Sequence, residues 1–79
     1  MLIHVKLLAN YREHLPPEAK NGGVELVVPD GTTVREAMSC FAIPLDDTSV
    51  IVVNGLTVDL DTRLKAGDVI SAFSAIAGG

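Results

Sequence analysis

The sequence predicts an α+β fold in which one mixed β-sheet packs against a single main helix. Four segments, at residues 2–8, 24–28, 49–53 and 69–73, carry alternating or β-branched apolar residues, and turn residues bound them. One clear helix signal lies between the second and the third segment. With 79 residues the chain provides one small domain, too short for a doubly wound sheet.

The first part of the chain contains two amphipathic strands joined by a long connection. Residues 2–8 partly alternate between apolar and polar positions, and residues 24–28 alternate again with Glu25 on the outer face. The residues expected to face the core are Ile3, Val5, Leu7, Val24, Leu26 and Val28. Residues 9–23 are polar, contain Pro16-Pro17 and show no sustained period, which predicts a wide loop.

A capping box marks the start of the helix. The Thr33 hydroxyl can accept a hydrogen bond from the Glu36 amide while the Glu36 carboxylate reaches back. An apolar stripe of about two turns follows, made up of Val34, Ala37, Met38 and Phe41. Pro44 stops any extension. Cys40 lies beside this stripe, where we expect a small buried residue rather than a sulfur relay.

The second part of the chain predicts the remaining strands. Residues 49–53 form a β-branched apolar run that is typical of a buried central strand. Asn54-Gly55 then predicts a tight turn into a further short strand, and residues 60–64 favour a short helical turn. Residues 69–73 predict the last strand, which is followed directly by the tail.

The tail ends in Ile76-Ala77-Gly78-Gly79, and we expect residues 74–79 to be flexible on a domain of residues 1–73. Glycine has no Cβ, so the last two residues can pass through a channel too narrow for other residues. In an extended conformation the tail reaches about 20 Å, at about 3.3 to 3.6 Å per residue. The Gly79 carboxylate is therefore the candidate reactive group, and an incidental, frayed end is the alternative.

Composition and charge narrow the class of partner. The formal net charge of -4 argues against nucleic acid, and the acidic residues of the second part suit a basic protein surface. No apolar stretch approaches the roughly 18 residues that span a bilayer, and one cysteine fits a reducing compartment, so we expect a cytoplasmic chain without a membrane partner. His4 and His14 have no neighbouring ligand cluster, and no phosphate-binding loop occurs, so no bound metal or cofactor is expected.

A docking surface for a protein partner is predicted near the tail. The last strand is apolar on both faces apart from Ser71, so one face is either covered or free to contact a partner. The candidate docking residues are Leu56, Val58, Ile70 and Phe73, together with Ile76 of the tail. Burial within the monomer is the alternative for these residues.

Three motifs occur in order along the chain. They are Val52-Val53-Asn54-Gly55, then Leu64-Lys65-Ala66-Gly67-Asp68-Val69-Ile70, and finally Ala77-Gly78-Gly79. Together they make the chain resemble, over essentially its whole length, the small sulfur-carrier proteins of the MoaD and ThiS family. This resemblance implies the β-grasp, or ubiquitin-like, fold, in which the first and last strands are central and parallel.

The resemblance also implies a chemistry in which the chain is a protein co-substrate and is not catalytic alone. An adenylating enzyme similar to the ubiquitin-activating kind would use ATP to convert the Gly79 carboxylate to an acyl-adenylate. Sulfur from a persulfide donor, a sulfurtransferase, would then displace AMP and leave a thiocarboxylate. Gly78, Ala77 and Ile76 would occupy the channel of the partner.

Within the family, the long segment 10–23 with Tyr11-Arg12-Glu13 resembles the small subunit of molybdopterin synthase, whose large subunit is then the expected acceptor. The segment before the diglycine, Phe73-Ser74-Ala75-Ile76, lacks the two prolines of many molybdopterin-type tails. The alternatives are sulfur transfer to a thiazole synthase or another cofactor pathway, conjugation to lysines as a ubiquitin-like modifier, and a plain interaction module.

Overall fold

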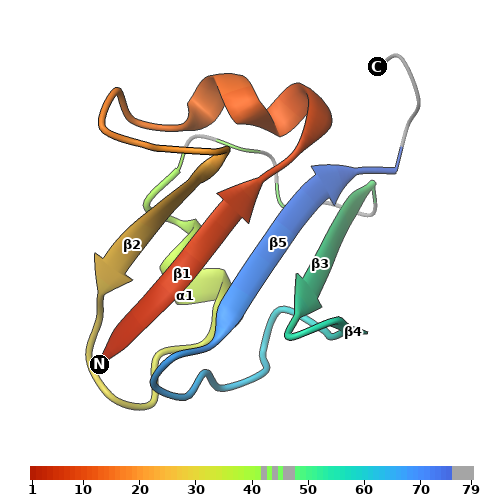
Figure 1. Cartoon of the computed structure of the whole chain (residues 1–79). Helices are drawn as coiled ribbons and strands as arrows, with labels where there is room; N and C mark the ends of the chain where they lie inside the picture. The colour runs from red at the N-terminus through yellow and green to blue at the C-terminus, as the bar shows by residue number, and fades with distance from the viewer. Residues whose placement is uncertain (42, 44, 46–47, 76–79) are drawn as a thin grey trace.

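A single five-stranded sheet forms the framework of the protein, as the computed structural model shows (Figure 1). The structure describes residues 1–41, 43, 45 and 48–75. In chain order the elements are β1 (Leu2–Leu7), the 3-10 helix η1 (Ala9–His14), β2 (Gly23–Val27), the helix α1 (Val34–Met38), β3 (Ser49–Val53), β4 (Leu56–Thr57) and β5 (Val69–Ser74). Across the sheet the strands follow the order β2-β1-β5-β3-β4. The predicted α+β, β-grasp architecture is confirmed.

The two central strands come from opposite ends of the chain. β1 and β5 pair in parallel, with Val5 opposite Ile70, whereas every other pairing in the sheet is antiparallel. β5 also pairs with β3, with Ala72 opposite Ile51. Because β5 has a strand on each side, its backbone hydrogen bonds are satisfied within the sheet, and its inner side chains lie at the centre of the core.

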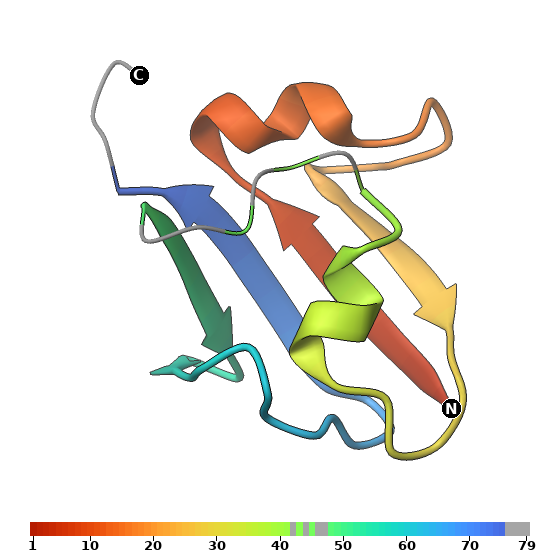
Figure 2. The ribbon, with the colours of Figure 1, turned by 180° about the vertical axis from the view of Figure 1, so that it is seen from behind.

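The helix α1 lies across one face of the sheet and encloses the core (Figure 2). Its capping box is present: the Glu36 amide donates to Thr33 Oγ1 at 3.2 Å, and the Thr33 amide donates to Glu36 Oε1 at 2.9 Å. The predicted apolar stripe is buried, and it meets the inner side chains of β1, β3 and β5. These contacts bury the apolar surface that each element would otherwise expose to water.

Three local predictions about structure need correction. The helix ends at Met38, so Cys40 lies beyond the helical period and is exposed instead of buried. Within the segment 9–23 the chain forms η1 where only a loop was predicted. Residues 60–64 form a turn and an isolated bridge between Arg63 and Thr33, not a helical turn. None of these differences changes the order of the strands.

The Asn54-Gly55 turn is confirmed, and its backbone explains the choice of residues. Asn54 has φ 52 and Gly55 has φ 87, both in the left-handed region that asparagine and glycine tolerate best. Two consecutive residues of this kind make the tight turn that joins antiparallel strands without opposing their twist. The turn delivers the chain from β3 into the short edge strand β4.

Candidate functional site

The end of β5 is where the chain leaves the sheet toward the predicted reactive terminus. β5 extends through Ser74, one residue further than predicted, and the Ala75 amide still donates to the carbonyl of Thr48 at 2.6 Å. The first two residues of the predicted tail are therefore held against the sheet. The candidate site residues Ile76, Ala77, Gly78 and Gly79 lie outside the described residues.

The 3-10 helix η1 stands beside this exit end of β5 (Figure 1). The Leu8 amide donates to the carbonyl of Ala72 at 2.9 Å, and the chain then turns at Ala9, which has φ 50. Tyr11 is buried, and its hydroxyl lies 2.7 Å from Ser49 Oγ at the start of β3. η1 therefore ties together the ends of β1, β5 and β3 around the point at which the chain leaves the sheet.

The four candidate docking residues do not form one surface. Leu56 is 70 % exposed and Val58 is half-buried, and both lie on the helix side of the sheet at its β4 edge. Phe73 is half-buried on the opposite, open face. Ile70 is completely buried in the core, so the alternative of burial within the monomer holds for this residue. A partner that contacts Phe73 approaches the open face, away from Leu56.

Two apolar residues on the open face were missed by the sequence analysis. Val50 lies opposite Phe73 in the β3–β5 register, and Leu8 follows the last paired residue of β1 on the other side of Phe73. Leu8 is 38 % exposed and Val50 is half-buried. The signal was present in the sequence, because Leu8 is an apolar residue at a position that alternation assigns to the outer face with His4 and Lys6. We refer to Leu8, Val50 and Phe73 as the exit face.

The motif residues Asn54 and Asp68 meet at the opposite end of β5. Asn54 Nδ2 donates to Asp68 Oδ1 at 2.9 Å, and the Val69 amide donates to Asn54 Oδ1 at 2.9 Å. Asp68 Oδ2 also accepts from the Lys65 amide at 2.8 Å. These bonds fix where β5 begins. The Val-Asn-Gly and Gly-Asp motifs therefore have a structural role far along β5 from the tail.

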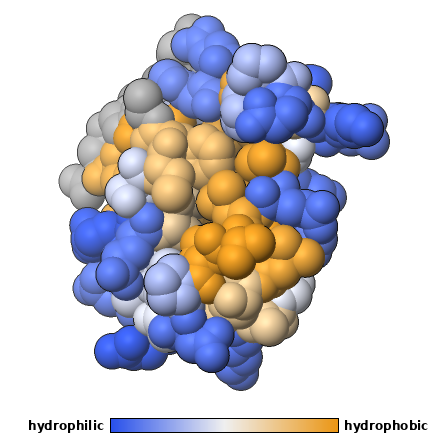
Figure 3. Space-filling view, turned by 90° about the vertical axis from the view of Figure 1, so that its left-hand side faces the viewer, coloured by the Kyte–Doolittle hydropathy of each residue, from blue (hydrophilic) through white to orange (hydrophobic). Residues whose placement is uncertain are grey.

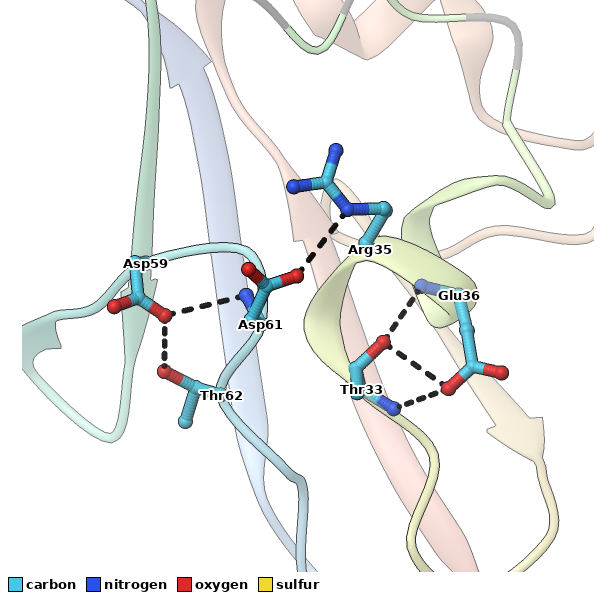
Figure 4. Close-up of polar contacts among 6 residues, drawn as sticks. All are labelled: Thr33, Arg35, Glu36, Asp59, Asp61 and Thr62. Atoms are coloured by element: carbon cyan, nitrogen blue, oxygen red, sulfur yellow. Dashed lines mark hydrogen bonds and ion pairs between the residues drawn. The ribbon is translucent and has the colours of Figure 1, made fainter.

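The acidic residues around the segment 59–62 also have structural partners (Figure 4). Asp59 Oδ1 accepts from the Asp61 amide at 3.2 Å and from Thr62 Oγ1 at 3.1 Å, which closes the turn. Asp61 Oδ1 lies 3.4 Å from Arg35 Nε on α1. This exposed ion pair joins the turn to the helix, and exposed pairs of this kind contribute little to stability.

Electrostatics single out one carboxyl group. The hydrogen bond from the Thr33 amide holds the pKa of Glu36 below its ordinary value of 4.5, the Thr33 hydroxyl acts in the same direction, and Arg63 adds to the effect. This carboxylate belongs to the capping box of α1. Among the residues that the structure describes, no three His, Cys, Asp or Glu side chains gather as a metal site would require.

Comparison with known proteins decides the family. The sequence profile of the family described as Mut7-C ubiquitin matches residues 1–77. The chain belongs to the Mut7-C ubiquitin family. The predicted relationship to ubiquitin-like proteins of the MoaD and ThiS kind is confirmed by this match and by the solved structures that follow. A comparison with curated proteins found no significant match.

Solved structures of similar fold include proteins described as a small archaeal modifier protein and as subunit 1 of molybdopterin converting factor. Small archaeal modifier protein 1 from Haloferax volcanii has a TM-score of 0.77 at 22% identity, covering 100% of both chains. A Pyrococcus furiosus protein described as molybdopterin converting factor, subunit 1, has a TM-score of 0.72 at 26% identity, covering 95% of this chain and 98% of that one. Subunit 1 of molybdopterin-converting factor from Helicobacter pylori 26695, solved in complex with subunit 2, has a TM-score of 0.64 at 21% identity over 100% of both chains.

No helix in the described part of the chain is long and apolar enough to cross a bilayer.

Proposed function

We propose that this Mut7-C ubiquitin-family chain is a sulfur carrier whose Gly79 carboxylate is converted to a thiocarboxylate. The observation that supports this most directly is the continuation of β5, a central strand anchored through Ala75, into the diglycine sequence. From Ala75 the four remaining residues extend over about 13 Å, at about 3.3 to 3.6 Å per residue. That reach suits insertion into the active site of a partner while the folded domain stays outside.

The proposed chemistry has three steps, and the partners supply the catalytic groups. An adenylating enzyme joins the Gly79 carboxylate to AMP and releases pyrophosphate from ATP. The terminal sulfur of a persulfide donor attacks the acyl carbon and AMP leaves, after which a thiol cleaves the S–S bond to the donor. The product is a Gly79 thiocarboxylate, a nucleophile that can pass its sulfur to an acceptor molecule.

The exit face supplies the recognition surface in this proposal. Leu8, Val50 and Phe73 are apolar, partly exposed and next to the strand end that carries the tail. An apolar cluster of this kind on the open side of a sheet is a natural protein contact. The structural similarity to subunit 1 of molybdopterin converting factor favours a molybdopterin synthase large subunit as the acceptor, with a thiazole synthase as the alternative.

The test is an intact-mass measurement on the protein after incubation with a cognate adenylating enzyme, ATP and a persulfide donor. Exchange of one oxygen for sulfur raises the mass by about 16 Da. Because Cys40 is exposed and can accept a sulfur atom of its own, the reaction is run on the Cys40→Ser variant. A matched variant without Gly78 and Gly79 must show no gain. An unchanged mass in the Cys40→Ser protein with active partners contradicts the proposal.

A second candidate function is a ubiquitin-like modifier, which the similarity to small archaeal modifier protein 1 favours. Here an isopeptide bond joins Gly79 to a lysine of a target protein. The last basic residue before the terminus is Lys65, so trypsin leaves residues 66–79 attached to the modified lysine. Peptides that carry this remnant in digested cell extract support the modifier function, and their absence alongside a detected thiocarboxylate favours the carrier alone.

A further inference from the structure

The hydrogen bonds between β1 and the edge strand β2 determine which residues of β2 direct their backbone groups away from β1. The amide of Val28 donates to the carbonyl of Met1 at 2.9 Å, and the Met1 amino group donates back to the Val28 carbonyl at 2.6 Å. At the other end the Leu7 amide donates to the carbonyl of Gly22 at 3.0 Å. In an antiparallel ladder the paired residues alternate. Between these two pairs, every second residue of β2 therefore forms backbone hydrogen bonds with β1, and the N–H and C=O groups of the other residues point away from β1.

The outward backbone groups are available at only two residues of this edge. Gly23 points outward, but its amide and carbonyl are bonded to Lys20 at 3.0 and 2.9 Å. Pro29 at the other end has no N–H to offer. Glu25 and Val27 remain, each with one N–H and one C=O directed away from β1. The edge therefore presents four backbone groups, two N–H and two C=O, to which a further strand can bond, and Gly23 and Pro29 limit this template at its two ends.

An apolar surface accompanies this template. Val27 is 83 % exposed, and its side chain lies on the open face of the sheet, opposite the helix. On the helix side, Val24, Leu26 and Val28 are only partly buried against the core. Figure 3, which views the molecule from the side where β2 lies, shows a broad apolar area. Exposed edges with apolar side chains tend to pair with a further strand.

The template is complementary to itself. In an antiparallel arrangement centred on Leu26, the N–H and C=O of Glu25 in one copy bond to the C=O and N–H of Val27 in the second copy. The two-fold axis generates the same pair between Val27 of the first copy and Glu25 of the second. Leu26 then faces Leu26, and Val24 faces Val28, which makes one continuous apolar row on the helix side. No like charges are opposed, since each Glu25 meets a valine.

Charge at the two ends of the template agrees with the same register. In this register Pro29 of the second copy falls beside Gly23, next to Lys20, and Asp30 is the next residue along the second copy. Lys20 and Asp30 are both exposed, and the Asp30 side chain is 95 % exposed. Opposite charges therefore meet at each end of the two-fold arrangement, which steers the copies into this register.

We propose that β2 pairs with β2 of a second copy of this chain, so that two sheets join into one continuous sheet across a two-fold axis. Because β1 separates β2 from β5, the exit face and the end of β5 stay accessible in such a dimer. The inference does not depend on the fate of Gly79. The contact is small, so the dimer is expected to be weak and to form reversibly.

Sedimentation velocity over a concentration series from about 5 µM to about 500 µM tests the pairing directly, since a small interface places the Kd within this range. The wild-type sedimentation coefficient is expected to rise with concentration toward that of a dimer. Val27→Glu places a carboxylate opposite Glu25 of the other copy in each of the two pairs, and this like-charge repulsion is expected to raise the Kd about tenfold or more. Leu56→Glu is the matched control, because Leu56 is 70 % exposed at the opposite edge of the sheet, and it leaves the Kd unchanged.

A cross-linking variant tests the register. In the non-hydrogen-bonded pair at the two-fold axis the Cα atoms lie about 4.5 Å apart, within the range of a disulfide. Leu26→Cys in the Cys40→Ser background is expected to form a covalent dimer on mild oxidation, whereas Leu56→Cys in the same background does not. Circular dichroism checks that each variant is folded. If Leu26→Cys does not fold, the sedimentation series on Val27→Glu still tests the proposal. A wild-type chain that stays monomeric at the highest concentration, or equal cross-linking at the two positions, overturns the proposal.

Discussion

Replacement of Asn54 by alanine separates two contributions that the structure places in one residue. The Asn54 side chain accepts from the Val69 amide and donates to Asp68, each at 2.9 Å, while its backbone adopts φ 52. Alanine removes both hydrogen bonds and tolerates the left-handed backbone poorly. Asn54→Gly removes the same bonds but accepts the backbone conformation without strain. The two variants together therefore measure the bonds and the backbone separately.

The magnitudes follow from the exposure of this network. Both bonds lie at the surface, so each contributes about 0.5 kcal/mol, the low end of the usual range for a hydrogen bond. The left-handed backbone adds about 1 kcal/mol for alanine. Asn54→Gly is thus expected to lower the free energy of unfolding by about 1 kcal/mol, and Asn54→Ala by about 2 kcal/mol. At about 4 to 8 °C per kcal/mol for a domain of this size, Asn54→Ala lowers the Tm by about 8 to 16 °C.

Urea denaturation followed by circular dichroism, with thermal melts as a second probe, measures both variants against the wild type. Equal losses in Asn54→Gly and Asn54→Ala would refute the reasoning about the backbone. A wild-type stability in Asn54→Gly would show that the hydrogen bonds to β5 contribute nothing. Because the network is far along β5 from the tail, neither variant should prevent formation of the proposed thiocarboxylate once it is folded.

Three further perturbations test other parts of the structure. The pKa of Glu36 is held below 4.5, so its charged form stabilises the native state above that pH, and this stabilisation is lost as the pH falls through the lowered pKa. The difference in the free energy of unfolding between wild type and Glu36→Gln, measured by urea titration, should therefore shrink below pH 4.5. A difference that stays constant with pH contradicts the lowered pKa. Tyr11→Phe should cost about 1 kcal/mol in the same assay, through the lost hydrogen bond to β3. Ile70→Ala should cost about 2 to 5 kcal/mol because the side chain is completely buried, whereas the exposed Leu56→Ala should stay within about 0.5 kcal/mol, and similar losses would contradict the assigned burial.

Much of the fold could be predicted because its signals are local. The alternation in β1 and β2, the capping box at Thr33 and the Asn54-Gly55 turn each depend on neighbouring residues, and all are present in the structure. The central, parallel pairing of β1 and β5 is not local, and only the resemblance to a known family predicted it. η1 was missed because Tyr11 is the one buried side chain among the five that the structure describes in it, and a single buried residue gives no apolar period.

The candidate site was harder to predict because it depends on which face of a strand is covered. Ile70 and Phe73 are both apolar residues of β5, but one points into the core and the other to the open face. Sequence alternation separates the two faces without saying which of them the helix covers. The period of α1 likewise gave no sign that the helix would end before Cys40, so that residue was assigned to the interior.

The parallel pairing of β1 with β5 has a consequence for the way the molecule is made. Residues 69–74 must lie between β1 and β3 before the sheet can close, so a growing chain on the ribosome cannot complete this sheet until β5 has been synthesised. The exit face joins residues of β1, β3 and β5 and forms only at that moment. In the proposed function, an adenylating enzyme that recognises the exit face would therefore act only on molecules in which β1, β3 and β5 have assembled, and incompletely folded copies would stay unmodified.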